Sequence, residues 1–345
     1  MRMSAFEPAI EVTRGGTVES IHAAAIAVTD PSGRILHALG DPTVEIVMRS
    51  AAKPFQAVTV LASGAAGEYG FTEGEIALIA GSHGGEEAHQ ATAASILSKA
   101  GLLAAALKCG CHVPFSRDAA REIARQGLDL DPLMNNCSGK HAGMLAACRI
   151  GGLPEESYLD PGHPVQRRNL ESVALFTGRA AETIGIGVDG CSAPTFMVGL
   201  HELATGFAKL AEAPGAAEAE DSPRRLLARV ADAMRAHPEM VAGDGMLDTA
   251  LMRAVPGLVA KVGADGIHAM GWPSPCGPIG MAVKIMDGDV GRGRMAAVMA
   301  LLAALGALGG EAGLPDSLTW HRSIHNHRRI DVGEVRPVFT LRRGG

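Results

Sequence analysis

Segments with the pattern of β-strands lie at both ends of this chain, and a long helical middle separates them. Near the N-terminus the pattern predicts strands at 9–14, 21–28 and 35–39, with a turn at 30–33. Near the C-terminus similar patterns predict strands at 258–262, 267–272, 280–286 and 335–341. This order indicates one antiparallel sheet built from both terminal regions around an inserted helical part, which is an α+β fold.

The middle of the chain has the apolar spacing of amphipathic helices separated by Gly/Pro loops. These helices are predicted at 86–100, 117–126, 165–176, 195–211 and 223–236, and an Ala-rich one at 295–309. The stretch 213–221 is expected to be an exposed loop. We therefore predict a single domain over 1–345, with a sheet subdomain at about 1–50 and 255–345 and a helical subdomain at about 51–254.

Composition argues against several classes of partner. The 345-residue chain has a net charge of −6 and only 12 aromatic residues (8 Phe, 2 Trp, 2 Tyr), so we expect no nucleic-acid partner. The longest apolar run falls short of the ~20 residues that a membrane span needs, and no signal-peptide pattern opens the sequence. We expect a cytoplasmic protein, in which the six cysteines are free thiols or metal ligands.

Lysine is scarce in this chain, which draws attention to the lysines that remain. Only 7 of the 31 basic residues are Lys. Burial can lower the pKa of Lys toward neutrality and make it a general base, whereas Arg stays charged. Lys53, Lys140 and Lys261 lie among small residues and are the candidates for such a role, while Lys99 and Lys209 fit solvated helix faces.

Two further motifs are candidates for chemistry. Ser50 and Lys53 form an S-x-x-K pattern, and on a helix this spacing places the hydroxyl and the amine on one face, as for a serine nucleophile and its base. The pattern is common by chance, and Pro54 disfavours helical geometry at Lys53. Residues 80–85 are Gly-rich around Ser82 and could form an oxyanion nest or a simple connector with Ser82 as a cap.

Cys137 and Cys191 both lie in Gly-rich polar surroundings. Together with Lys140 or His141 they could bind a soft divalent ion such as zinc. Isolated cysteines are more often buried small residues, and this alternative stays open.

Taken in order, five short blocks of this sequence resemble the L-asparaginase II family of the Rhizobium etli type. The blocks are 49–56, 81–86, 135–141, 188–191, and Lys261-Val262-Gly263 with Cys276-Gly277-Pro278. The family has a fold similar to serine β-lactamases and β-lactamase-like glutaminases. This fold agrees with the predicted terminal sheet and helical middle.

The resemblance implies a set of site residues and an activity. It implies two catalytic couples, Ser50 with Lys53 and Ser82 with Lys261, and substrate-binding roles for Arg49 and Asp189. It implies a zinc site formed by Cys137, Lys140 and Cys191, in which the metal aids substrate binding rather than chemistry, and it makes a homodimer plausible.

The expected reaction is hydrolysis of L-asparagine to L-aspartate and ammonia through an acyl-enzyme. Ser50, deprotonated by Lys53, attacks the carboxamide, and the leaving ammonia is protonated through Ser82 and Lys261. Three alternatives stay open: a glutaminase, another acyl-serine hydrolase on the same scaffold, and a non-catalytic protein that binds amino acids or zinc. Asn and Gln differ by one methylene, worth only ~1–3 kcal/mol in a pocket.

Overall fold

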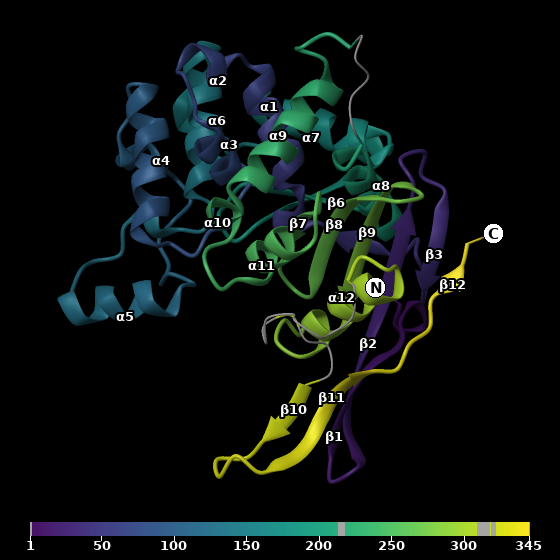
Figure 1. Ribbon diagram of the computed structural model, residues 1–345. Coiled ribbons are helices and arrows are strands. Elements are labelled where there is room, and N and C mark those ends of the chain that lie inside the picture. The colour runs from purple at the N-terminus through teal and green to yellow at the C-terminus, as the bar shows by residue number, and fades with distance from the viewer. Residues whose placement is uncertain (1, 213–217, 309–317, 319–321, 345) are drawn as a thin grey trace. The chain divides into compact units, whose positions relative to one another are not determined.

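The computed structural model describes residues 2–212, 218–308, 318 and 322–344. The chain forms two compact units, which are described separately (Figure 1). The sheet unit comprises Met1–Met48, Val198–Ala211 and Ala250–Gly345, and the helical unit comprises Arg49–Met197 and Glu212–Thr249.

Antiparallel strands from both ends of the chain build the sheet unit. Its strands are β1 (Glu7–Arg14), β2 (Thr17–Thr29), β3 (Ile35–Leu39), β4 (Glu45–Val47), β7 (Val259–Val262), β8 (Ile267–Ser274), β9 (Gly277–Ile285), β10 (Arg322–His325), β11 (Asp331–Pro337) and β12 (Arg342–Arg343). The main sheet has the order β10-β11-β1-β2-β9-β8-β7, and β3 pairs with both β2 and β12. In Figure 1 the purple β1 and the yellow β11 run side by side, so the two ends of the sequence meet in one sheet.

Two helices pack on this sheet, α8 (Leu200–Leu210) and α12 (Gly293–Ala304). Gly271 of β8 and Gly280 of β9 are directly paired. A Cβ at Gly280 would lie 1.8 Å from the carbonyl oxygen of Ala204, and one at Gly271 would lie 2.2 Å from that of Phe207. These two glycines therefore let α8 lie directly against the sheet, where its buried face completes the core.

The helical unit consists of short helices and one β-hairpin. Its elements are η2 (Arg49–Ala52), α1 (Lys53–Ala62), α2 (Ala65–Glu68), α3 (Glu73–Ile79), α4 (Glu87–Lys99), η3 (Ala104–Ala106), α5 (Arg117–Gln126), η4 (Pro132–Met134), α6 (Ser138–Ile150), η5 (Glu155–Ser157), α7 (Pro164–Thr177), η6 (Ala181–Thr183), β5 (Gly185–Val188), α9 (Pro223–Ala236) and α10 (Pro238–Val241). β6 (Pro194–Gly199), which pairs with β5, and α11 (Leu247–Ala254) cross the boundary between the units. α6 lies fully buried against α1, α3 and α4 over most of its length.

The predicted α+β class, with an antiparallel sheet formed by both terminal regions, is confirmed. The helices predicted at 117–126 and 223–236 have the bounds of α5 and α9. The helix predicted at 195–211 is wrong in its first part, because Pro194–Gly199 is a strand whose residues Thr195, Phe196 and Val198 are buried. Their β-branched and aromatic side chains favour a half-buried strand over a helix. Residues 213–217 of the predicted loop and residue 309 of the last predicted helix lie outside the described residues.

Glu75 on α3 is a buried carboxylate with a complete set of donors. Lys99 Nζ lies 2.7 Å from Oε2, the Thr72 N–H donates to Oε2 at 2.7 Å, and the Ser95 hydroxyl donates to Oε1 at 2.8 Å. Burial raises the pKa of Glu75, but the hydrogen bonds from Lys99, Thr72 and Ser95 together outweigh burial and lower it. A carboxylate held this way stabilises the fold only while it is ionised.

Glu75→Gln is expected to lower the free energy of unfolding by about 1.5–3 kcal/mol at neutral pH. The pKa of Glu75 is lower in the folded state, so its contribution is present above the ordinary Glu pKa of 4.5 and is lost as the pH falls through the folded-state pKa. Urea unfolding at several pH values measures this. The matched control is Glu73→Gln, because Glu73 pairs with Arg229 at the surface, where such pairs contribute about 0–1 kcal/mol. A difference that does not shrink in acid would contradict this account.

Candidate active site

Lys53, the first residue of α1, is the most completely enclosed cation of the helical unit among the described residues, at 1% exposure. Its Nζ lies 2.6 Å from the carbonyl oxygen of Gly81, 3.1 Å from that of Asn136 and 2.9 Å from the Oγ of Ser82. The amine is therefore surrounded by three oxygen atoms, two from the loop that follows α3 and one from the residues just before α6.

These three contacts determine what a neutral Lys53 does. Carbonyl oxygens only accept, and a neutral amine has two N–H groups and one lone pair. The protonated amine donates to all three oxygen atoms, whereas in the neutral form two N–H groups suffice for the carbonyls of Gly81 and Asn136, and the lone pair is left for the Ser82 hydroxyl. Burial is the largest influence on the pKa of Lys53 and lowers it; nearby Cys137 opposes this shift, and the charge of Lys140 adds to it. Lys53 thus has the surroundings of a general base.

Ser50 lies in η2, the single turn before α1, whereas Lys53 is the first residue of α1. The hydroxyl that contacts Lys53 Nζ in the described structure belongs to Ser82. The family resemblance pairs Ser82 with Lys261 instead. Arg49 has a φ of 50°, a region that non-glycine residues rarely occupy. Such strained backbone is concentrated at functional sites, and here it sets the direction in which the chain enters α1.

The loop that carries Ser82 is held from within the fold. The Gly85 N–H donates to Nδ1 of His83, so the proton of a neutral His83 is on Nε2. The Ser138 hydroxyl donates its own proton to the Leu133 carbonyl, and it therefore accepts from His83 Nε2–H. The N–H groups of Gly81, Ser82 and Gly85 all have acceptors inside the protein. Of the two interpretations of residues 80–85, the simple connector fits these three amides, because their N–H groups already stabilise the loop and are not available to an oxyanion.

Arg49 and Asp189 form an ion pair within the helical unit. Arg49 Nε lies 2.7 Å from Asp189 Oδ1, and the side chains are 27% and 11% exposed. The Gly190 N–H also donates to Oδ1 at 2.8 Å. The structure thus brings the two residues predicted to bind substrate into direct contact, and both side chains are partly exposed.

Cys137, Lys140 and Cys191 form a buried cluster. Lys140 Nζ lies 3.3 Å from Cys191 Sγ, and all three side chains are less than 5% exposed. A hydrogen bond from the Cys137 thiol lowers the pKa of Cys191 far below the usual thiol range, against the opposing effect of burial and with further help from the charge of Lys140. The same contact and burial raise the pKa of Cys137. Of the two thiols, Cys191 therefore has the lower pKa.

Tyr158 influences which ring nitrogen of His141 carries the proton. The Tyr158 hydroxyl accepts from the Lys108 N–H at 2.9 Å and lies 2.7 Å from His141 Nδ1. When that hydroxyl donates to Nδ1, the proton of a neutral His141 sits on Nε2, which has no hydrogen-bond partner among the described residues. Burial is the largest effect on the pKa of His141 and lowers it, which favours the neutral form. Nothing in the sequence around Tyr158 pointed to this role.

Lys261 lies on β7, in the sheet unit, and is fully buried. Its Nζ lies 3.0 Å from the carbonyl oxygen of Val262. The helical unit by itself therefore contains Ser50, Lys53, Ser82 and the cysteine cluster, and the pairing of Ser82 with Lys261 stays a prediction.

Comparison with known proteins assigns a family to this arrangement. Residues 10–337 match the family model described as L-asparaginase II. The chain belongs to the L-asparaginase II family. This confirms the resemblance seen in the five sequence blocks, and it makes the chain an amidohydrolase with a small-molecule substrate. No helix in the described part of this L-asparaginase II family member is long and apolar enough to cross a membrane.

Solved structures with a similar fold carry the name Mglu. One is 18% identical, with a TM-score of 0.45, over 84% of this chain and 69% of that chain. Mglu in its native form is 19% identical, with a TM-score of 0.43, over 83% of this chain and 65% of that chain. Mglu in its tris and glutamate form is 18% identical, with a TM-score of 0.43, over 84% of this chain and 61% of that chain. A search of curated protein sequences finds no match.

Proposed function

We propose that this L-asparaginase II family member hydrolyses L-asparagine to L-aspartate and ammonia through an acyl-enzyme on serine. The observation that carries the proposal is the position of Lys53: a buried amine that lies 2.6 Å and 3.1 Å from two carbonyl oxygens and 2.9 Å from a serine hydroxyl. A lysine held this way is a base for hydroxyl groups, and acyl transfer from an amide needs one.

In this mechanism Ser50 is the nucleophile. Lys53 takes the proton of Ser50 as Oγ bonds to the side-chain carboxamide carbon. Collapse of the tetrahedral intermediate breaks the C–N bond, and the nitrogen leaves as ammonia with a proton supplied by Ser82. Water then hydrolyses the ester, which releases L-aspartate and restores the Ser50 hydroxyl.

The contact between Lys53 and Ser82 supports the proton route of this scheme. Lys53 receives a proton in the first step, and Ser82, 2.9 Å away, can relay a proton to the leaving nitrogen and be reprotonated by Lys53. We propose that Lys261 assists Ser82 and that Arg49 and Asp189 bind the charged groups of the amino-acid substrate. The same contact also favours a second candidate, in which Ser82 is itself the nucleophile and Lys53 its direct base.

Ammonia release from L-asparagine and L-glutamine, measured in parallel on the purified protein, tests the activity. Release from asparagine alone supports the proposal, and equal release from both amides identifies a broad glutaminase-asparaginase. Thermal stabilisation by aspartate or zinc without ammonia release would show a non-catalytic binding protein and would overturn the proposal.

The cysteine cluster fits the metal that the family resemblance implies. Two buried sulfur atoms are donors that zinc prefers, the pKa of one of them is lowered, and Lys140 Nζ lies 3.3 Å from that sulfur, Cys191 Sγ. The described residues contain no group of three or more His, Cys, Asp or Glu side chains arranged for a metal ion, so Lys140 is needed as a ligand. Burial lowers the pKa of Lys140, but the neighbouring thiols, Cys191 above all, outweigh burial and raise it, so zinc must displace its proton. When bound, zinc would supply a positive charge for substrate binding.

Cys191→Ala is expected to abolish tight zinc binding, because it removes the thiol of lower pKa from the cluster. Metal analysis of protein loaded with zinc and then dialysed against a weak chelator measures the zinc content per chain. Cys148→Ala is the matched control: Cys148 is also buried, and burial raises the pKa of its thiol to about 11. Equal zinc content in the two variants would contradict the assignment.

A further inference from the structure

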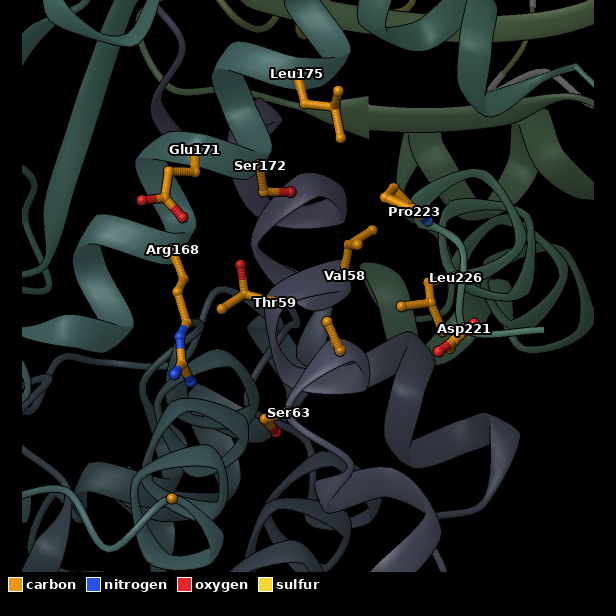
Figure 2. A pocket seen from close by; sticks show the side chains of 12 residues that line it. Val58, Thr59, Ser63, Arg168, Glu171, Ser172, Leu175, Asp221, Pro223 and Leu226 are labelled. Carbon is orange, nitrogen blue, oxygen red and sulfur yellow. The ribbon is translucent and has the colours of Figure 1, made fainter. Parts of the chain in front are cut away.

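A hollow on the helical unit lies between α1, α7 and the start of α9 (Figure 2). Its volume of about 440 Å³ is within the range of small-molecule sites. The residues that line it do not include Ser50, Lys53, Ser82 or the cysteine cluster. The hollow is therefore separate from the candidate active site, although α1 contributes to both.

One side of the hollow is apolar. Val58 of α1, Leu175 of α7, and Pro223 and Leu226 of α9 form this side, as Figure 2 shows. Leu175 is 53% exposed, so part of this apolar side faces solvent. An apolar group of a ligand would cover it.

Thr59 contributes a buried hydroxyl that has no hydrogen-bond partner in the described structure. The side chain is only 5% exposed and lines the hollow. A helical threonine ordinarily donates to the carbonyl four residues earlier. Here that carbonyl, of Phe55, accepts from the Ser172 hydroxyl at 2.6 Å. The Thr59 hydroxyl is thus left for a molecule in the hollow.

Charged side chains of both signs also line the hollow. Arg168 and Glu171 extend from α7, one turn apart, and Asp221 lies on the other side beside Leu226 (Figure 2). None of the three forms an ion pair with a described residue. A simple anion would meet two carboxylates and a simple cation would meet Arg168, whereas a zwitterion satisfies both signs.

We propose that this hollow binds a free α-amino acid with an apolar side chain. The carboxylate pairs with Arg168 and accepts from Thr59, the ammonium pairs with Glu171, and the side chain covers Val58 and Leu175. Thr59 lies six residues after Lys53 on the same helix. A ligand in the hollow therefore contacts the element that carries the proposed base, without sharing a residue with the proposed reaction.

Isothermal titration of the full chain with three matched probes tests the proposal: L-leucine, 4-methylpentanoate, which lacks the ammonium, and 3-methylbutylamine, which lacks the carboxylate. L-leucine is expected to bind saturably, and each analogue at least about tenfold more weakly. Arg168→Gln is expected to weaken L-leucine binding about tenfold or more, while Arg167→Gln, on the same helix but outside the hollow, leaves it unchanged. No saturable binding, or equal binding by the two variants, overturns the proposal.

Thr59→Val provides a second readout that does not depend on charge. It keeps the shape of the side chain and removes the hydroxyl, so the free protein is expected to unfold at a higher temperature while L-leucine binds more weakly. Unchanged affinity would overturn the contact with Thr59. Ammonia release is unaffected by the outcome, so failure of this site and failure of the proposed function remain distinguishable.

Discussion

Ser50→Ala is expected to lower the rate of ammonia release from L-asparagine by about four to six powers of ten. The alanine lacks the oxygen atom that forms the acyl bond to the substrate. The other groups of the site move protons during that reaction and do not replace this oxygen. Because Ser50 lies in the turn before α1 and is only partly exposed, loss of one hydroxyl leaves the turn and α1 intact. Thermal unfolding and zinc content are expected to match the parent protein. Ser98→Ala, at an exposed position of α4, is the matched control and is expected to keep full activity.

The same variant distinguishes the two serines. Intact-protein mass spectrometry after an acid quench detects an aspartyl ester on the parent protein if the ester accumulates. Ester formation in Ser50→Ala but not in Ser82→Ala would assign the nucleophile to Ser82, with Lys53 as its direct base. Near-full turnover by Ser50→Ala would overturn Ser50 as the nucleophile.

Lys53→Arg is expected to lower kcat by about two to four powers of ten, the contribution typical of a general base. Arginine keeps the positive charge and donors for the Gly81 and Asn136 carbonyls, but it does not lose its proton. Lys53→Met, which removes the charge and keeps an unbranched side chain, is expected to be equally slow. Both variants need a thermal unfolding check because the site is fully buried. Lys99→Arg, which keeps the partly exposed ion pair with Glu75, is the matched control.

The pH dependence of kcat/KM gives an independent measure of Lys53. The unprotonated amine is the active form, so the rate is expected to rise as the pH rises through the pKa of Lys53. Burial lowers this pKa, so the acidic limb is expected below the ordinary lysine value of 10.5. An acidic limb at the ordinary lysine value would contradict the role of Lys53 as a buried base. Activity in Lys53→Arg close to that of the parent would exclude it.

The main architecture was predictable from local patterns. The patterns at the two ends predicted strands at 9–14 and 335–341; β1 contains all of the first, whereas β11 contains only 335–337 of the second. The helices α5 and α9 follow from apolar spacing. The stretch 195–199 was not predictable in this way. Its short apolar run fits either a helix or a strand, and only pairing with β5 decides between them.

The sequence by itself determined the chemical types in the site, since scarce lysines, Gly-rich turns around Ser82 and two cysteines in polar surroundings are visible without a fold. Which groups meet was decided by tertiary structure. Lys53 contacts Ser82 and a carbonyl at Asn136, residues 29 and 83 positions away. His141 is oriented by Tyr158, and Arg49 is paired with Asp189. Spacing along a helix fixes only near neighbours, whereas the lowered pKa of Lys53 and of Cys191 arises from burial and from partners that folding alone brings together.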